Sequence, residues 1–447
     1  MFMRKMVGCC AMLAAFAAAG NGTLSITARA ERESALYASG ETITFQVAVN
    51  DADGKPVSGV ELPYTLTGDG GLSLKGKIVP KDGRAEISVK PERHGFVLLS
   101  IQPPANGARR RPNPVCAGAG VAVEKIRPGT PECPDFDRFW QNEAAAVRQS
   151  KFGCSLTEVR QDNAKARVYD VRLTDGKLAV RGYLALPAKT NPAGHPILMM
   201  FNGAGTIGAN FKSAIQRANR YDCIVFNMSI HDVPNGLSRE EQAKLRRSSE
   251  IFQYMYRGVD SPETYPIRDI FRRVVCAIEY MKSRPEWDGK RIVVQGGSLG
   301  GAQAIFAAYI EPRTALCIAN APALSDHFGG DLKQAAGWPN MFETLAKKKL
   351  DPTAARRTMG YFDTVNFAKK LPCPIRLSVG FIDTICPPTS VYALYNSIPG
   401  EKSIVNVVTG AHGPVADKRE KSVFVQNISY LDELLLPPKK PRRNGKK

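Results

Sequence analysis

The chain has few residues of the kinds that build metal centres or membrane spans. Only five of its 447 residues are histidine, and none of its ten cysteines shows the Cys-x-x-Cys spacing of zinc or redox sites. No apolar run reaches the roughly 20 residues that a membrane-spanning helix needs. A complete phosphate-binding P-loop is also missing. We therefore expect no metal, no cofactor and no membrane span.

The longest apolar stretch lies at the N-terminus. Arg4 and Lys5 precede an alanine-rich segment from Met6 to Ala19, and Gly20 follows it. A positive start, a short apolar segment and small residues are typical of a secretory signal peptide. We assign residues 1–22 to such a signal and expect a secreted or periplasmic protein.

Residues 23–125 have a hydrophobic pattern of their own. Apolar residues alternate with polar or small ones, as in half-buried β-strands. Asp53-Gly54 and Asp82-Gly83 are typical of hairpin turns between such strands. We predict an antiparallel β-sandwich of immunoglobulin-like type. The segment has no tryptophan, so a spacer or docking module is favoured over a carbohydrate-binding one. The alternating stretches are Ile43–Val49, Val60–Leu66 and Ala85–Val89.

Residues 126–437 follow a different pattern, in which short apolar strands alternate with amphipathic helices. Pro103 to Pro114 mark a loop or linker before this part, and Asp135 begins its first helix. From Ile267 to Met281, apolar residues recur at helical spacing. This alternation predicts a doubly wound, mostly parallel α/β sheet with helices on both faces.

One serine has the sequence surroundings of a catalytic nucleophile. Ser298 lies in Gly296-Gly297-Ser298-Leu299-Gly300, after the apolar run Ile292–Val294 and before an alanine-rich segment. A strand, a sharp turn and a helix in this order form the nucleophile elbow of an α/β-hydrolase. Glycine is common in this chain, so the pattern needs partners further along the sequence. In this fold they follow in the order serine, acid, histidine.

Both partners occur after the serine in that order. Arg376–Gly380 reads as a late strand, and Asp383 follows its carboxyl end, where open parallel sheets place functional loops. Ser403–Val408 reads as the next strand, and His412 follows in a glycine-flanked loop. Each residue alone could be an ordinary loop residue. Taken jointly, they predict Ser298 as nucleophile, His412 as base and Asp383 as the acid that orients it.

A serine mechanism also needs backbone N–H groups that stabilise the oxyanion. We predict the N–H of Leu299 as one donor and that of Ala204, after the apolar strand Ile197–Phe201, as the other. A plain turn with glycines for close packing is the alternative. Gly203 to Gly208 also match the dinucleotide fingerprint, but no acid ends the next strand, so nucleotide binding is not favoured.

These segments together resemble the acetyl xylan esterase and cephalosporin C deacetylase family. The resemblance covers most of the chain, from about Pro128 to Leu436, and it implies an esterase that releases acetyl groups from acetylated sugars. On this resemblance the nucleophile falls on Ser298, the acid on Asp383 and the base on His412. It also implies a ring-like homo-oligomer, although the extra N-terminal domain weakens that expectation. The segments are Tyr254–Gly258, Gln295–Gly301, Ser378–Pro388, Tyr392–Asn396 and Ala411–Gly413.

Three positions depart from the family pattern. Asn202-Gly203-Ala204 stands where the family usually has His-Gly-Tyr, and Leu299 stands where it usually has glutamine. The small Ala204 predicts a larger acyl pocket, so esters of larger acyl groups or non-carbohydrate esters are an alternative substrate class. A peptidase and an inactive carbohydrate-binding module are further alternatives on the same fold. The complete set of three residues argues against an inactive protein.

The formal net charge is +19, and part of it lies in residues 438–447, which we predict to be a disordered basic tail. Nucleic-acid binding is not favoured, because basic residues are not interleaved with stacking aromatics. Weak attraction to an anionic envelope or to acidic polysaccharide fits the charge better, with simple solubility as the alternative.

Overall fold

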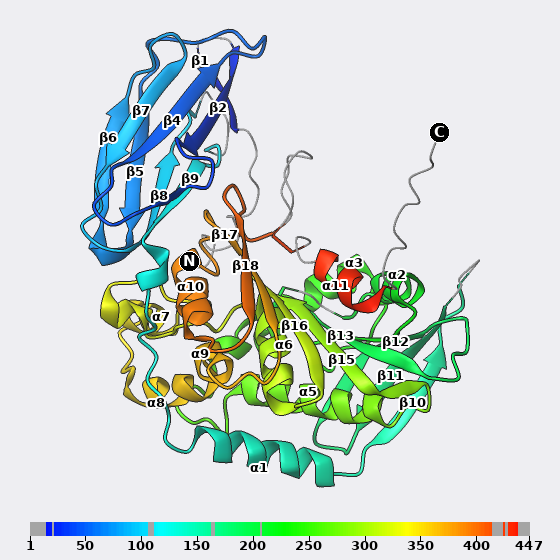
Figure 1. The fold of residues 1–447 in the computed structure, drawn as a ribbon. Helices are drawn as coiled ribbons and strands as arrows, with labels where there is room; N and C mark the ends of the chain where they lie inside the picture. Colours follow the sequence, from blue (N-terminus) through cyan, green and yellow to red (C-terminus); the bar gives the residue numbers. More distant parts are fainter. Residues whose placement is uncertain are drawn as a thin grey trace, which may run out of the picture.

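The computed structural model describes residues 15–19, 22–105, 111–161, 166–205, 208–413, 423–424 and 428–436. Within them the chain forms an all-β N-terminal part and a larger α/β part (Figure 1). Most of the expected signal segment and all of the basic tail lie outside the described residues. No helix among the described residues is long and apolar enough to cross a membrane.

Residues 22–125, here called the β-region, contain every strand of two sheets except β1. One has the strand order β1-β2-β4-β7 and is antiparallel; the other has the order β3-β9-β8-β5-β6 and is antiparallel except for the β3–β9 pair. β1 precedes the region and falls within the expected signal segment. The strands are β1 (Ala15–Ala19), β2 (Gly22–Ala30), β3 (Leu36–Tyr37), β4 (Ile43–Asn50), β5 (Leu62–Gly68), β6 (Ser73–Ile78), β7 (Arg84–Val89), β8 (Gly95–Ile101) and β9 (Val115–Val121).

The three predicted strands of the β-region are present, and the alternation explains their burial. In β4 every second residue is buried, and these side chains pack in one core with β5 and β8 of the other sheet. The immunoglobulin-like class stays a prediction.

The predicted turns at Asp53-Gly54 and Asp82-Gly83 are of hairpin type, because an antiparallel bridge closes each of them, between Asn50 and Pro56 and between Lys81 and Arg84. The longer strands on either side of each turn, however, do not pair with each other. Both turns form, with left-handed glycines, but β4 and β5 belong to different sheets, as do β6 and β7. Each of the two turns therefore carries the chain from one sheet to the other.

The α/β part is built on one sheet of nine strands in the order β10-β11-β12-β14-β13-β15-β16-β17-β18. The six strands from β14 to β18 in this order are parallel, and the first three form an antiparallel extension. The prediction of a mostly parallel sheet is therefore confirmed. The strands are β10 (Gly153–Glu158), β11 (Arg167–Thr174), β12 (Ala179–Leu186), β13 (His195–Phe201), β14 (Ile224–Met228), β15 (Trp287–Gly297), β16 (Thr314–Asn320), β17 (Ile375–Gly380) and β18 (Lys402–Val407).

Helices cover both faces of this sheet. In β13, Met199 and Phe201 pack in a core with α1, α5 and α6, while Leu198 and Met200 pack in another core with α2 and α11. A strand buried on both faces needs a continuous apolar run, which is what β13 shows. The α-helices are α1 (Phe136–Gln149), α2 (Phe211–Tyr221), α3 (Arg239–Leu245), α4 (Ser249–Phe252), α5 (Pro266–Lys282), α6 (Leu299–Ile310), α7 (Met341–Lys347), α8 (Thr353–Phe362), α9 (Thr364–Ala368), α10 (Pro388–Ser397) and α11 (Ile428–Leu435).

The proline-rich segment from Pro103 to Pro114 joins β8 to β9 inside the β-region. The link to the α/β part comes later, after the short helix η2 (Val123–Lys125). In Figure 1 the β-region lies next to the end of the large sheet that carries β17 and β18, with α10 beside the junction.

Candidate active site

Ser298 occupies a sharp turn between β15 and α6. Its backbone has φ 58° and ψ −126°, a conformation that side-chain-bearing residues rarely adopt. The flanking glycines permit the turn. A Cβ on Gly296 would lie 2.2 Å from the carbonyl oxygen of Gly300, and one on Gly300 would lie 2.2 Å from that of Phe201. These contacts explain why the elbow requires glycine at both positions.

The structure brings the three predicted side chains into one hydrogen-bonded chain. Nε2 of His412 lies 2.9 Å from Oγ of Ser298, and Nδ1 of His412 lies 2.7 Å from Oδ2 of Asp383. An ionised carboxylate only accepts hydrogen bonds, so Nδ1 carries the donated proton and Nε2 faces the serine as an acceptor. This arrangement can take a proton from the Ser298 hydroxyl.

The acid and the histidine come from the ends of neighbouring strands. Asp383 follows β17 and is fully buried, while His412 follows β18 with 14% of its side chain exposed. Oδ1 of Asp383 accepts hydrogen bonds from the backbone N–H groups of Ile385 (2.8 Å) and Cys386 (2.9 Å). Both carboxylate oxygens therefore have partners, which fixes the orientation of the acid and holds its charge in a buried place.

The predicted oxyanion donors flank the serine. Leu299 is the first residue of α6, so its N–H is one of the groups that a helix leaves without an internal partner. On the other side, a Cβ on Gly203 would lie 3.4 Å from Cβ of Ser298. The loop that contains Ala204 therefore passes directly beside the nucleophile.

The loop of residues 202–205 is held by a residue that the sequence analysis missed. Nε2 of Gln303 donates to the carbonyl of Asn202 at 3.0 Å, and the Asn202 side chain donates to the carbonyl of Met228 at 2.6 Å. Gln303 is fully buried in α6, on an otherwise apolar helix. The sequence does contain a sign of this role, since Gln303 is the one amide in a helix of alanine and other apolar residues. A buried polar side chain needs a hydrogen-bond partner, so such a residue is expected to hold a neighbouring segment.

Phe424 is a second residue that the sequence analysis missed. Its ring lies 5.4 Å from the imidazole of His412 at 87°, and it packs so close to Gly297 that a Cβ there would lie 2.6 Å from the ring. Nothing in the sequence near Phe424 marks it, because its place depends on how the chain returns after β18.

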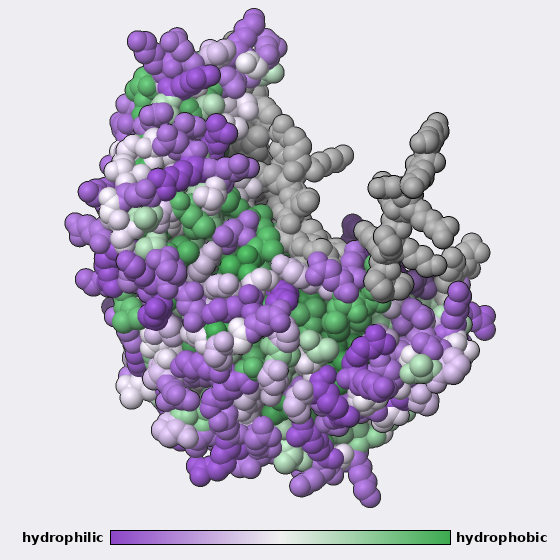
Figure 2. All heavy atoms as spheres, in the orientation of Figure 1, coloured by the Kyte–Doolittle hydropathy of each residue, from purple (hydrophilic) through white to green (hydrophobic). Residues whose placement is uncertain are grey.

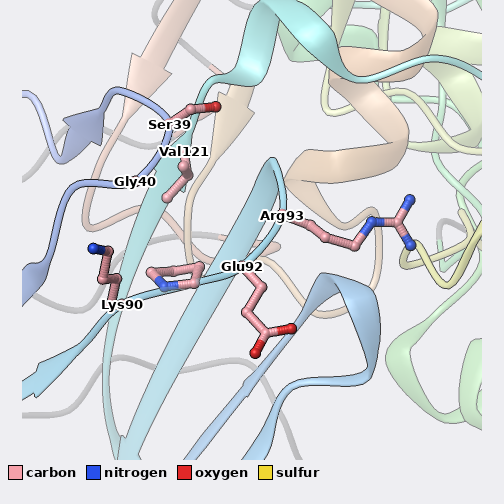
Figure 3. A pocket seen from close by; sticks show the side chains of 7 residues that line it. Ser39, Gly40, Lys90, Glu92, Arg93 and Val121 are labelled. Atoms are coloured by element: carbon pink, nitrogen blue, oxygen red, sulfur yellow. The ribbon is translucent and has the colours of Figure 1, made fainter.

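A cavity of about 470 Å³ opens at the serine and the histidine. No Asp or Glu side chain is among its described lining residues, and no group of three or more metal-ligating side chains occurs in the described ranges. Another cavity, of about 390 Å³, lies in the β-region and contains none of the three residues (Figure 3). The lining of the first includes Met200, Asn202, Gly203, Ala204, Asn210, Arg217, Ser298, His412 and Phe424.

The chain was compared with known protein families and with known proteins. Residues 121–428 match the family model described as acetyl xylan esterase (AXE1). The acetyl esterase Axe7A of Xylanibacter ruminicola is 32% identical over 376 residues, which cover 82% of each chain.

Two solved structures share the fold. Acetyl xylan esterase 1 from Thermoanaerobacterium sp. JW/SL YS485 superposes with a TM-score of 0.56 at 22% identity, covering 70% of this chain and 96% of that one. The acetyl xylan esterase from Paenibacillus sp. R4 gives 0.55 at 22% identity, covering 66% and 93%. Together with the family model and the 32% identical relative, the arrangement of strands and side chains leads to one conclusion: the chain belongs to the acetyl xylan esterase family.

Proposed function

We propose that the protein is a serine carboxylester hydrolase that removes acetyl groups from acetylated xylan or xylo-oligosaccharides. The observation that carries this proposal is the hydrogen-bonded chain from Asp383 through His412 to Ser298. Family membership supports acetylated carbohydrate as the substrate class.

The reaction proceeds in two displacements through an acyl-enzyme. Oγ of Ser298 attacks the acetyl carbonyl carbon while Nε2 of His412 takes the hydroxyl proton. The tetrahedral intermediate collapses, the bond to the sugar oxygen breaks, and His412 returns the proton to that oxygen. Water then attacks the acetyl-serine, again giving a proton to His412, and acetate leaves as Ser298 regains its proton. Asp383 orients the imidazole and stabilises its charged form throughout.

The negative charge on the carbonyl oxygen needs donors that are already in place. The N–H groups of Leu299 and Ala204 fill this role in our proposal, because both lie beside the serine on backbone that is held by packing. Each such donor typically contributes about 10²- to 10³-fold in rate. The side chains at these positions can therefore differ from the family pattern without removing the oxyanion hole.

The test is acyl release by the purified protein from acetylated xylo-oligosaccharides and p-nitrophenyl acetate, with Ser298→Ala as the matched variant. We expect turnover that falls by about 10³-fold or more in the variant while the melting temperature stays close to that of the parent. Absence of Ser298-dependent turnover of any ester would overturn the proposal and leave a carbohydrate-binding role.

A second candidate is an esterase for larger acyl groups, which the small Ala204 beside the 470 Å³ cavity favours. If Ala204 leaves room for the acyl chain, the parent hydrolyses p-nitrophenyl butyrate or octanoate faster than acetate. Ala204→Phe then shifts the acetate-to-butyrate ratio of kcat/KM toward acetate by about tenfold. An unchanged ratio in the variant would show that this position does not limit acyl size.

We also infer export from the N-terminal sequence, and weak attraction to anionic polysaccharide from the net charge of +19. Binding to an acidic polysaccharide should then weaken as salt rises, because screening shortens the reach of surface charge. Sequencing the N-terminus of the protein recovered outside the expressing cells tests cleavage after residue 22.

A further inference from the structure

The β-region and the loop of the proposed catalytic acid share one hydrophobic core. Phe381 lies two residues before Asp383 and is 2% exposed. It packs with Val379, Val391 and Tyr392 of the α/β part in the same cluster as the core of the β-region. Figure 2 shows hydrophobic side chains gathered where the two parts meet, between largely hydrophilic outer surfaces.

Two residues of the β-region contact Phe381 directly. The ring of Phe96, in β8, lies 5.0 Å from the ring of Phe381 at 70°, an edge-to-face pair. The backbone of Gly118, in β9, approaches the peptide of Phe381 so closely that a Cβ would lie 2.2 Å from its carbonyl oxygen. The β-region thus holds both the side chain and the peptide group of Phe381.

The opposite side of this segment contacts the strand end that leads to His412. The N–H of Phe381 donates to Val407 at 3.2 Å, and the N–H of Ile382 donates to Gly410 at 3.2 Å. Gly410 lies two residues before His412. The segment that leads to the acid therefore lies between the β-region and the segment that leads to the histidine.

Polar contacts fix the register of the junction. Asp69 of the β-region accepts hydrogen bonds from Thr389 Oγ1 (2.6 Å), the N–H of Phe96 (2.7 Å) and the N–H of Ala335 (2.8 Å). Thr389 is in the first turn of α10, three residues after Cys386, whose N–H binds the acid. One carboxylate of the β-region thus orients Phe96 and the far end of the acid loop together.

Further contacts tie the same edge of the β-region to the α/β part. The N–H of Gly70 donates to the carbonyl of Lys333 at 2.7 Å. The side chain of Arg93 extends away from Lys90 and Glu92 in Figure 3, and its Nη1 lies 3.5 Å from the carbonyl of Leu332. These contacts leave little freedom for the β-region to slide over Phe381.

We propose that Phe96 and Gly118 of the β-region are positioning residues, which hold the Phe381 peptide so that Asp383 meets His412. This inference rests on the proposed function of the three residues. It assigns the region a role beyond that of a spacer, because the acid loop depends on it for its position.

The test compares Phe96→Leu with Phe45→Leu, in the full-length protein. Phe45 is fully buried in β4, in the other sheet of the β-region, and serves as the matched core variant. For each protein, kcat and KM for p-nitrophenyl acetate are measured with the rate and final extent of Ser298 labelling by a fluorophosphonate. We expect Phe96→Leu to lower kcat and the labelling rate together, by about tenfold, with KM and the final extent unchanged.

Phe45→Leu should lower the melting temperature while keeping kcat for each labelled serine. Gly118→Ala, which pushes the Phe381 carbonyl directly, should lower kcat more than Phe96→Leu does. The inference is overturned if Phe96→Leu keeps the parental kcat for each labelled serine, or if Phe45→Leu loses as much. Either of those results would refute the role of Phe96 and Gly118 while the parent protein remains an active esterase. A parent protein without Ser298-dependent turnover would instead refute the proposed function.

Discussion

Carboxylates lie next to a histidine at several places in the α/β part, and two of these places differ in nearly everything else. At one, Asp383 binds His412, which reaches Ser298 and a cavity. At the other, Asp326 and His327 lie beside Asp363 in the interior, and none of them is among the described residues that line that cavity. The same residue types thus lie beside an open cavity at the first place and away from it at the second.

The hydrogen bonds of Asp326 and Asp363 in the interior connect separate segments of the chain, as in a structural site. Oδ1 of Asp326 accepts hydrogen bonds from the N–H groups of Gly129 (2.7 Å) and Thr130 (3.2 Å). Asp363 accepts from the hydroxyl of Thr130 and from the N–H of His327, both at 2.7 Å. These bonds join the segment before α1 to the loop after β16 and to the start of α9.

A perturbed pKa in this protein reflects burial and is not by itself a sign of catalysis. Burial, with the nearby Asp363 charge, raises the pKa of Asp326 to about 7, and burial lowers the pKa of His327. Neither ring nitrogen of His327 has a hydrogen-bond partner among the described residues. Geometry toward a nucleophile and an open cavity, rather than the size of a pKa shift, distinguishes the candidate active site.

Removal of each histidine in turn should give the largest difference in activity between the two places. His412→Leu should lower kcat by about 10³-fold or more, because in the proposed mechanism His412 is the base that takes the proton of Ser298. His327→Leu should keep kcat and keep or raise the melting temperature, since it replaces a buried imidazole without partners by an apolar side chain. Esterase assays and calorimetry on both variants check this. Comparable activity losses in the two would place both histidines in the reaction.

The acids provide the second test. Asp383→Asn should lower kcat by about 10³- to 10⁴-fold, because an amide can donate to His412 and favour the wrong tautomer. Asp326→Asn retains an oxygen that can accept from Gly129 and Thr130, so we expect kcat near the parental value. Measuring kcat for both variants with p-nitrophenyl acetate decides between them, and a large loss in Asp326→Asn would contradict a structural role.

The stability of the protein should also depend on pH through Asp326, although less strongly than activity depends on the residues above. The pKa of Asp326 is about 7 in the folded protein against an ordinary 3.8, so the folded chain keeps a proton that the unfolded chain has lost. The free energy of unfolding therefore falls as pH rises from about 4 to about 7. Asp326→Asn cannot ionise and lacks this contribution to the fall.

Calorimetry at pH 5 and pH 8 measures this effect. The melting temperature of Asp326→Asn relative to the parent should be higher at pH 8 than at pH 5. An equal difference at both values would show that the carboxyl group does not titrate differently in the folded and unfolded chains.

The positions of the three site residues could be predicted because each follows a readable apolar strand. Ser298, Asp383 and His412 stand just beyond strand ends, and parallel strands bring their carboxyl ends to one edge of the sheet. The local sequence around each residue therefore determines that all three lie at the same edge of the sheet. The distances of 2.7 and 2.9 Å between them were not predictable, because they depend on packing between separate segments.

The parts that could not be predicted all depend on contacts across long stretches of sequence. Phe424 meets His412 only because the chain returns over Gly297. Asp53-Gly54 forms a hairpin-type turn, yet the strand before it, β4, pairs with β2 and β7 and not with β5, which follows the turn. The β-region was predicted as a separate domain because the alternation of apolar and polar residues in its strands accounts for a core of its own. Nothing in its sequence shows that Phe96 packs on Phe381.

The close approach of Gly118 to Phe381 has a consequence for anyone who recombines this protein. In a chimera, the α/β part of this protein can be joined to the β-region of a relative, or the reverse. The junction is kept only if glycine stands where Gly118 faces the Phe381 carbonyl, because a side chain there would clash with it. Chimeras are therefore best joined outside the pair, carrying β9 and the acid loop together from a single parent, so that the two surfaces remain matched.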